Sequence, residues 1–232
     1  LLAMLQQHHK GALLVLTADD VDSLQLQTDL AAFDVTAHVL PREELGDDGE
    51  PDPTTRSERQ RALQRHRSDR APLIAGIEAM LQPVATPRSL GRAQLELTAG
   101  QKLERAQVLL RAQAAGLRSV PLVLAPGECS VRGDVVDLFP MGAEAAVRLE
   151  FLDDVLEQVR SFDPASQRTT AVHERYRLAL GTTAAAEDGP MLKHLVPQQL
   201  LVVTFEPLRV KERTARAVAF DSTFAPRVQE LQ

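Results

Sequence analysis

Few residues in this sequence have types and spacing that could support catalysis. Asp153 and Asp154 are adjacent carboxylates, the residue type that a catalytic acid and base pair requires. Neighbouring residues on a strand or hairpin point to opposite faces, so this pair favours a turn instead. Ser130 gives no basis for a triad with any histidine, because geometry and not sequence order identifies a triad.

A metal site is also poorly supported. His8 and His9 are adjacent, but on a helix their side chains diverge by about 100°. No Cys, Asp or Glu lies close to them in the sequence. Cys129 is the only cysteine, which excludes an internal disulfide and predicts a small buried side chain. A lone thiol is consistent with a reducing, cytoplasmic setting.

Nucleotide hydrolysis would require a phosphate-binding loop. No Gly-x-x-x-x-Gly-Lys followed by Ser or Thr occurs in the chain. The sequence lacks an initiator Met and begins within a helical pattern, so we expect a missing upstream segment, where such a loop would lie.

One segment could contact nucleic acid. It is a basic run of six arginines, Arg56, Arg59, Arg61, Arg65, Arg67 and Arg70. A helix with this run could contact phosphates. The interspersed Glu58 and Asp69 favour a solvated helix face instead.

Composition limits the class of protein. The chain has 232 residues, of which 44% are hydrophobic and 25% charged, and its net charge is −6. These values predict one or two globular domains and argue against disorder. No apolar run approaches the roughly 20 residues that span a bilayer, so no membrane is implied. The acidic balance and the 3% aromatic content argue against a DNA-coating or base-stacking surface.

The patterning predicts alternating strands and helices at the start of the chain, and hence an α/β layer. Strands are expected at 13–16, 35–40 and 72–75, and helices at 56–67, 77–81 and after Asp19 or Asp20. The last of these should bury an apolar stripe of Val21, Leu24, Leu26 and Leu30.

The middle of the chain has a different pattern. A strand at 94–97 precedes a helix at 101–115, with Leu103, Ala106, Leu109 and Leu110 on one face. Strand-like segments then follow at 118–124, 129–132, 135–139, 147–151 and 157–161, with a further strand at 172–180. Their close spacing predicts an antiparallel meander in a small α+β domain.

From Gly181 the pattern returns to α/β. A short helix is expected at 191–195, a buried strand at 200–203 and a helix at 210–218. We therefore predict that residues 1–86 and 180–232 form one discontinuous α/β domain, interrupted by an α+β domain at 87–179.

Three motifs in the middle segment carry a resemblance to a known family. They are Gly127-Glu-Cys-Ser-Val-Arg-Gly-Asp-Val-Val-Asp-Leu-Phe-Pro-Met-Gly142, Val147-Arg-Leu-Glu-Phe-Leu-Asp-Asp154 and Ser161-Phe-Asp-Pro-Ala-Ser-Gln-Arg-Thr169. Together they resemble the N-terminal, UvrB-like region of bacterial transcription-repair-coupling factors. The resemblance implies a helicase-like (RecA/UvrB-like) α/β domain interrupted by a small UvrA-binding domain with an antiparallel sheet.

The resemblance also implies a binding surface. Arg132 and Arg148 occupy the positions of two arginines that face UvrA. Leu152 stands where the family often has an aromatic residue, and Cys129 replaces a phenylalanine. Both replacements reduce the apolar contact area. Nine acidic residues and four arginines between Gly127 and Arg168 give that segment a charge of −5, which favours a protein partner over DNA.

A degenerate nucleotide site is implied as well. Residues 200–207 resemble a strand that would end in a magnesium-binding Asp-Glu pair, but Phe205 stands at the Asp position, before Glu206. Phenylalanine has no oxygen ligand for Mg²⁺.

We therefore hypothesise a UvrA-recruiting module without catalytic activity or cofactor of its own. ATP and Mg²⁺ would act in a downstream motor of the parent protein, and RNA polymerase and DNA would be bound by other parts. The alternatives are part of an active UvrB-type ATP-dependent helicase, or a direct DNA-binding module.

Overall fold

The structure is a computed structural model, and it describes residues 2–9, 11–46, 49, 51–88, 94–180, 188–190, 195 and 200–229. The chain divides into two compact units. The first contains Leu1–Thr86 and Asp188–Gln232, and the second contains Pro87–Glu187. The boundaries thus follow residues 86 and 187, where the sequence suggested 86 and 179.

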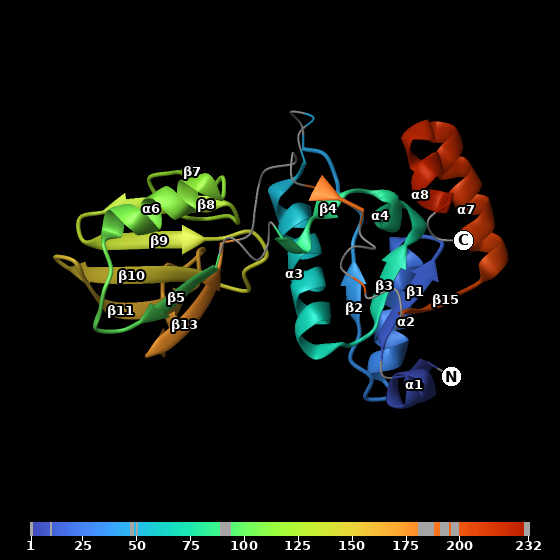
Figure 1. The fold of residues 1–232 in the computed structure, drawn as a ribbon, viewed down its shortest axis with the longest axis horizontal. Coiled ribbons are helices and arrows are strands. Elements are labelled where there is room, and N and C mark those ends of the chain that lie inside the picture. Colours follow the sequence, from blue (N-terminus) through green and yellow to red (C-terminus); the bar gives the residue numbers. More distant parts are fainter. Residues whose placement is uncertain are drawn as a thin grey trace. The chain divides into compact units, whose positions relative to one another are not determined.

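The first unit is built on a parallel sheet with the strand order β15-β1-β3-β2 (Figure 1). Its strands are β1 (Ala12–Thr17), β2 (His38–Leu40), β3 (Leu73–Gly76) and β15 (Leu200–Thr204). Its helices are α1 (Leu2–His8), α2 (Asp20–Ala31), α3 (Pro53–Asp69), α4 (Ile77–Leu81), α7 (Pro207–Phe220) and α8 (Ala225–Gln229), with the 3-10 turn η4 (Ser222–Phe224) before α8. A short ladder joins β4 (Val84–Ala85) to β14 (Asp188–Gly189).

Helices cover both faces of this sheet. Leu13 and Val15 of β1 pack with Leu30 of α2. Leu14 and Leu16 project to the other face and pack with Leu63 of α3. Because both faces of a parallel strand are buried, β1 reads as a continuous apolar run, as the sequence predicted.

Helix α2 differs in part from its expected amphipathic pattern. Asp19 caps its first turn, with Oδ1 accepting a hydrogen bond from the Asp22 N–H at 3.0 Å. Leu26 and Leu30 are buried, but the predicted stripe is wrong for Val21 and Leu24, which are exposed. The buried stripe instead begins at Ser23, one helical turn before Leu26, and the Ser23 hydroxyl bonds to Thr17 of β1 at 2.7 Å.

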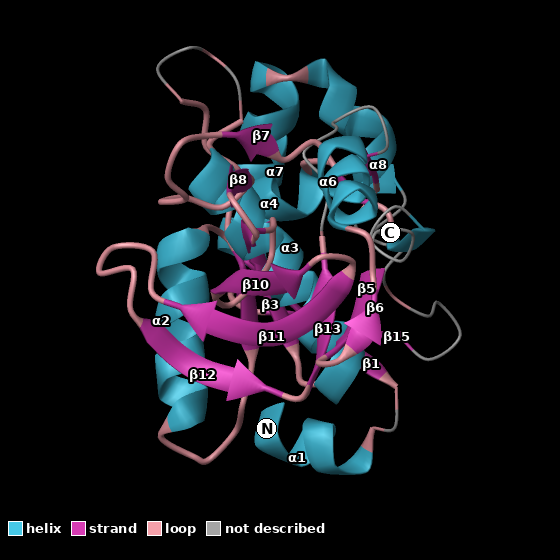
Figure 2. Cartoon of the chain, turned by 90° about the vertical axis from the view of Figure 1, so that its left-hand side faces the viewer, coloured by secondary structure: helices cyan, strands magenta, loops and turns pink. Residues whose placement is uncertain are grey.

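The second unit has a predominantly antiparallel sheet in the order β12-β11-β10-β9-β8-β7. Figure 2 shows β10, β11 and β12 as neighbouring curved strands. The strands along this path are β7 (Arg118–Ser119), β8 (Glu128–Arg132), β9 (Val135–Phe139), β10 (Ala146–Leu152), β11 (Val155–Phe162) and β12 (Thr169–His173). Strand β6 (Gln101–Lys102) pairs with β11, and β5 (Gln94–Thr98) pairs with β13 (Arg175–Ala179).

Helix α6 (Arg105–Ala114) packs against this unit's core. Its buried residues are Val108 and Ala112, which lie in the same cluster as Val136, Leu149 and Val159 of the sheet. The predicted apolar face is wrong for Ala106 and Leu110, which are exposed, but Leu103 and Leu109 do pack against the core. The helix also begins later than predicted, at Arg105, because residues 101–102 form β6.

Other differences concern segment ends. The strand expected at 118–124 is limited to Arg118–Ser119. The strand expected at 172–180 is two strands, because the chain leaves β12 after His173 and pairs with β5 from Arg175. The helix expected at 191–195 lies outside the described residues except for Leu195. None of the described helices has the length and apolar character needed to cross a membrane.

The chain therefore combines a helix-covered parallel sheet with an antiparallel sheet. This mixed α/β and α+β content is what the sequence predicted.

Candidate functional site

Strand register brings several polar side chains to one face of the antiparallel sheet. Asp137 of β9 lies directly opposite Ser130 of β8 and Arg148 of β10, and Arg148 lies opposite Arg160 of β11. Residues directly opposite one another project to the same face. Arg132 follows Ser130 by two positions and shares this face, which we call the polar face.

Asp137 is the centre of the polar face. Its side chain is only 1% exposed. Oδ2 accepts a hydrogen bond from Arg132 Nη2 at 2.6 Å. Arg148 donates from Nε to Oδ1 at 2.7 Å and from Nη2 to Oδ2 at 2.9 Å. Such a two-point contact fixes both groups, and the hydrogen bonds that Arg148 donates to Asp137 raise the pKa of the Arg148 guanidinium.

Arg148 is held on three sides and does not project freely. Nη2 also donates to Gln167 Oε1 at 3.1 Å, and Cζ lies 4.6 Å from the centroid of the Phe162 ring. The side chain is 17% exposed. The sequence had suggested that the guanidinium groups of Arg132 and Arg148 both project from the sheet toward a partner. The structure differs because the register places Arg148 in a central strand, opposite Asp137.

Arg132 projects further, because it lies at the end of β8 and in the second-last strand of the sheet. Its side chain is 46% exposed. Its contact with Asp137 uses Nη2 alone. Within the described part of the chain, Nε and Nη1 have no hydrogen-bond partner, so in this half-exposed side chain they remain available as donors.

Leu152 ends β10 and is 60% exposed. It is four positions from Arg148, so alternation along the strand places both on the polar face. Val155, directly opposite Leu152, is also exposed. Asp153 and Asp154 form the turn between these two residues, with Asp153 at a φ of 53°, so the turn interpretation is confirmed.

One end of the polar face is covered by a loop. Val120 and Val123 pack against Phe162 and Phe139. Glu128 anchors this loop, because its Oε2 accepts hydrogen bonds from the N–H groups of residues 124 and 125, each at 2.9 Å. The accessible part of the polar face is therefore the part that contains Arg132.

Cys129 lies in the core, where burial raises the pKa of its thiol. The expectation of a small buried side chain is confirmed. The exposed His8 ring bonds to the Met4 carbonyl at 2.7 Å.

The positions Phe205 and Glu206 lie at the carboxyl end of β15. Phe205 donates its N–H to the Leu16 carbonyl at 2.8 Å, and its exposed ring offers no metal ligand. Glu206 precedes α7 and pairs with Arg209 at 2.8 Å. Arg209 also lies 3.0 Å from Asp22.

These ion pairs hold the Arg209 guanidinium at the carboxyl end of the parallel strands. Open α/β sheets usually bind ligands in this region. The Arg209 guanidinium lies among the carboxylates of Glu206, Asp22 and Asp19. Among the described residues, no group of three or more His, Cys, Asp or Glu is arranged to hold a metal ion.

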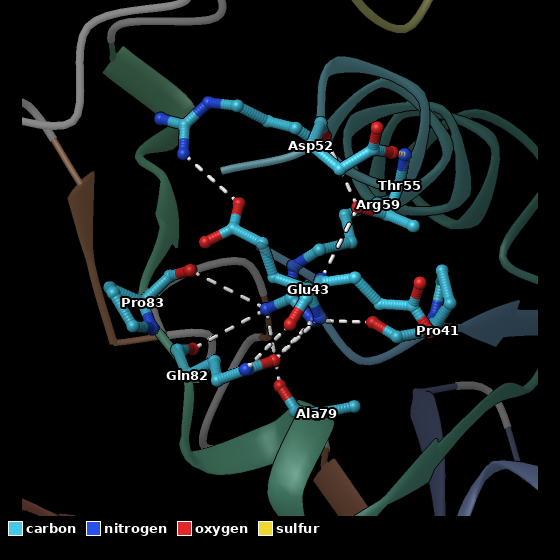
Figure 3. A network of polar contacts seen from close by, with 10 residues as sticks. Pro41, Glu43, Asp52, Thr55, Arg59, Ala79, Gln82 and Pro83 are labelled. Atoms are coloured by element: carbon cyan, nitrogen blue, oxygen red, sulfur yellow. Dashed lines mark hydrogen bonds and ion pairs between the residues drawn. The ribbon is translucent and has the colours of Figure 1, made fainter. Parts of the chain in front are cut away.

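The basic run on α3 is partly internal. Figure 3 shows Arg59 surrounded by backbone carbonyls. Nη2 donates to Ala79 at 3.2 Å, Gln82 at 3.5 Å and Pro83 at 3.4 Å, while Nη1 donates to Pro41. Only 2% of Arg59 is exposed.

Arg56 is also buried and pairs with Glu43 at 3.0 Å. The prediction of a solvated helix face is therefore wrong for Arg56 and Arg59. It is confirmed for Arg65, Arg67 and Arg70, which are exposed.

Sequence reasoning missed Asp137, Gln167 and Phe162 as parts of the site. One signal was available for Asp137. An aspartate between apolar neighbours in a strand is unfavourable unless a partner compensates its charge.

Comparison with known proteins finds a family model that matches most of the second unit. Residues 95–181 match the family model of the UvrB interaction domain. The transcription-repair-coupling factor of Escherichia coli (strain K12) is 32% identical over 173 residues, which are 73% of this chain and 15% of that protein. The same factor from Myxococcus xanthus is 33% identical over 186 residues, or 78% of this chain and 14% of the relative.

Similarity to UvrB itself is weaker. The UvrABC system protein B of Chlorobaculum tepidum is 39% identical, but over 72 residues, 31% of this chain and 10% of that protein. The resemblance to transcription-repair-coupling factors inferred from the motifs is confirmed. The chain spans about 15% of the length of the first of these relatives.

Proposed function

We propose that the second unit is a UvrA-binding module of a transcription-repair-coupling factor, acting in transcription-coupled nucleotide excision repair. The observation that carries this proposal is the match to the UvrB interaction domain over 95–181, which includes Arg132, Arg148 and Leu152. These three residues form the proposed contact surface.

The geometry supports a protein partner. Arg132 has unused hydrogen-bond donors, and the exposed Leu152 lies on the same face of the sheet. A planar guanidinium with several donors suits a protein interface. The surrounding segment 127–168 carries a charge of −5, which opposes contact with a DNA backbone.

The first unit, by this proposal, is a discontinuous helicase-like (RecA/UvrB-like) α/β domain. Its parallel sheet and its assembly from two chain segments support that assignment. We further propose that this part of the protein has no catalytic activity or cofactor of its own. Phe205 at the magnesium position and the Arg209 pairing of Glu206 support this view.

The parent protein's ATP and Mg²⁺ would act in a downstream motor, and its contacts with RNA polymerase and DNA would involve other parts. The proposed setting is the cytoplasm. An active UvrB-type helicase is less favoured, because the UvrB relatives match over less of the chain or at lower identity. Direct DNA binding by α3 is less favoured, because Arg56 and Arg59 face inward.

A titration of the chain with purified UvrA tests the proposal. Removing one partner of a charged interface contact typically costs about 2–5 kcal/mol, so Arg132→Ala should weaken binding at least about tenfold. Arg111→Ala is the matched control, because Arg111 is exposed on α6 in the same unit. Unchanged affinity of the Arg132 variant would remove this residue from the site.

A second measurement addresses the DNA-binding alternative. Binding of the chain to a DNA duplex that falls steeply with salt would support it. Absence of duplex binding at low salt would exclude it.

A further inference from the structure

Asp137 is the one buried acid that two arginines of the polar face share. It accepts three hydrogen bonds, one from Arg132 and two from Arg148. A buried carboxylate is stable only when its charge is paired and its lone pairs are used. Its 1% exposure leaves no access for a partner protein, so any effect on binding must act through the arginines.

The orientation of Asp137 is set by Arg148 and not by Arg132. Arg148 contacts both carboxylate oxygens. Arg148 is itself fixed by Phe162 below it and by the Gln167 amide oxygen beside it. Gln167 in turn donates to the carbonyls of Val123 at 3.1 Å and Pro164 at 2.7 Å. A chain of fixed contacts therefore ends at Asp137 Oδ2.

Arg132 takes its position from that oxygen. One donor is used on Asp137, and a guanidinium has five N–H donors in a planar fork. The half-exposed head group is thus oriented from below while its outer donors remain available. A held guanidinium loses less freedom on binding than a mobile one, which favours affinity.

We infer that Asp137 is a positioning residue that presents Arg132 to a carboxylate on the partner. This inference rests on the proposed binding of UvrA. A carboxylate has two oxygens in the spacing that a guanidinium fork matches. A DNA phosphate could match the fork as well, but the acidic surroundings of Arg132 disfavour a polyanion.

The Asp137→Asn variant separates positioning from simple charge attraction. It removes one negative charge from the polar face. If UvrA were attracted by charge alone, its acidic group would bind this variant more tightly. If Arg132 must be held, binding becomes weaker. We expect about tenfold weaker binding, seen as faster dissociation with an unchanged or faster association.

A double-mutant cycle with Arg132→Ala shows whether Asp137 acts through that arginine. In the Arg132→Ala background, Asp137→Asn should cause no further loss of UvrA binding. A general structural defect would instead add its full effect. Arg148→Lys provides a second variant, since it keeps the charge and loses the two-point contact with Asp137. Arg148→Lys should weaken UvrA binding less than Asp137→Asn does. Its effect should also disappear in the Arg132→Ala background.

The outcomes distinguish this inference from the proposed function. If the chain does not bind UvrA at all, both fail. If UvrA binds but Arg132→Ala leaves its affinity unchanged, Arg132 is removed from the site and the positioning role fails, while the proposed function stands. If Arg132→Ala weakens binding while Asp137→Asn leaves it unchanged, strengthens it or acts additively, only the positioning role fails. The folded state of each variant is followed through the fluorescence of Tyr176, the single tyrosine of a chain without tryptophan.

Two further substitutions test the partner's chemistry. Arg132→Gln keeps hydrogen-bond donors without charge and should lose as much affinity for UvrA as Arg132→Ala. Arg132→Lys keeps the charge and should retain part of the affinity for UvrA. Full retention by Gln would identify a neutral acceptor and overturn the carboxylate assignment. Binding of labelled duplex DNA that is lost in Arg132→Ala would assign the contact to phosphate and overturn it as well.

Discussion

The guanidinium of Arg148 lies over the ring of Phe162, with 4.6 Å between Cζ and the ring centroid. Phe162 is buried on the side of the sheet that bears the polar face, between the covering loop and the arginine. A cation above an aromatic ring is attracted by the electron-rich face of that ring. This contact links a small apolar cluster to the proposed binding site.

Phe162→Leu should therefore have two effects. It should lower the free energy of unfolding of the second unit by about 1–3 kcal/mol, through lost ring packing and the lost cation contact. It should also weaken UvrA binding, because Arg148 loses one support of its fixed position. Urea titrations followed by Tyr176 fluorescence report the unfolding of this unit alone, since Tyr176 packs against its core.

Phe139→Leu is the control for the Phe162 variant. Phe139 packs in the same apolar cluster. Its loss should lower stability without weakening UvrA binding. Equal binding defects in the two variants would contradict a specific role for the Arg148 contact.

The buried Arg59 should stabilise the first unit. Arg59→Met would leave the carbonyls of Pro41, Ala79 and Gln82 without this donor. An unsatisfied buried polar group costs about 1–3 kcal/mol, so we expect a loss of at least about 2 kcal/mol. Native-state hydrogen exchange in α4 and β3 would measure it. Arg67→Met, on the exposed side of the same helix, should change exchange little. A similar loss in both variants would show that α3 is sensitive to any change of charge.

The sequence predicted the strands of the antiparallel sheet well where apolar and polar residues alternate along the strand. Strand β9 has the expected bounds of 135–139, and β10 and β11 each extend beyond theirs by one or two residues. The turn at Asp153 followed from local chemistry in the same way. Local patterns sufficed here because antiparallel neighbours are joined by short turns.

The contacts within the site could not be predicted this way. Arg148 is partly covered because β9 places Asp137 opposite it and because Gln167 reaches Val123, 44 residues earlier in the chain. Arg59 is buried because it meets backbone carbonyls 18 to 24 residues away in the sequence, and composition cannot distinguish such an arginine from a solvated one. Both outcomes depend on non-local geometry, so residue type alone gave the wrong exposure.

Burial of His66 should make the first unit less stable in mild acid. The ring is buried against α3's end, with Nδ1 2.7 Å from the Ala71 carbonyl. Desolvation lowers its pKa below the ordinary value of about 6.5, and the nearby His38 lowers it further, while the bond to Ala71 opposes the shift. The folded state therefore keeps this ring neutral where the unfolded chain binds a proton. The stabilising contribution is complete above pH 6.5 or so and is lost as pH falls through the folded pKa.

His66→Gln isolates that effect. Glutamine does not titrate and its amide can still donate to the Ala71 carbonyl. Between pH 7 and pH 5, hydrogen exchange in α3 should accelerate more in the parent chain than in this variant, after correction for the intrinsic pH dependence of exchange. The neighbouring pair of His38 and Asp69, 2.7 Å apart, is present in both proteins, so only its electrostatic coupling to His66 differs between them. An equal acceleration in the two proteins would assign the acid sensitivity to another group.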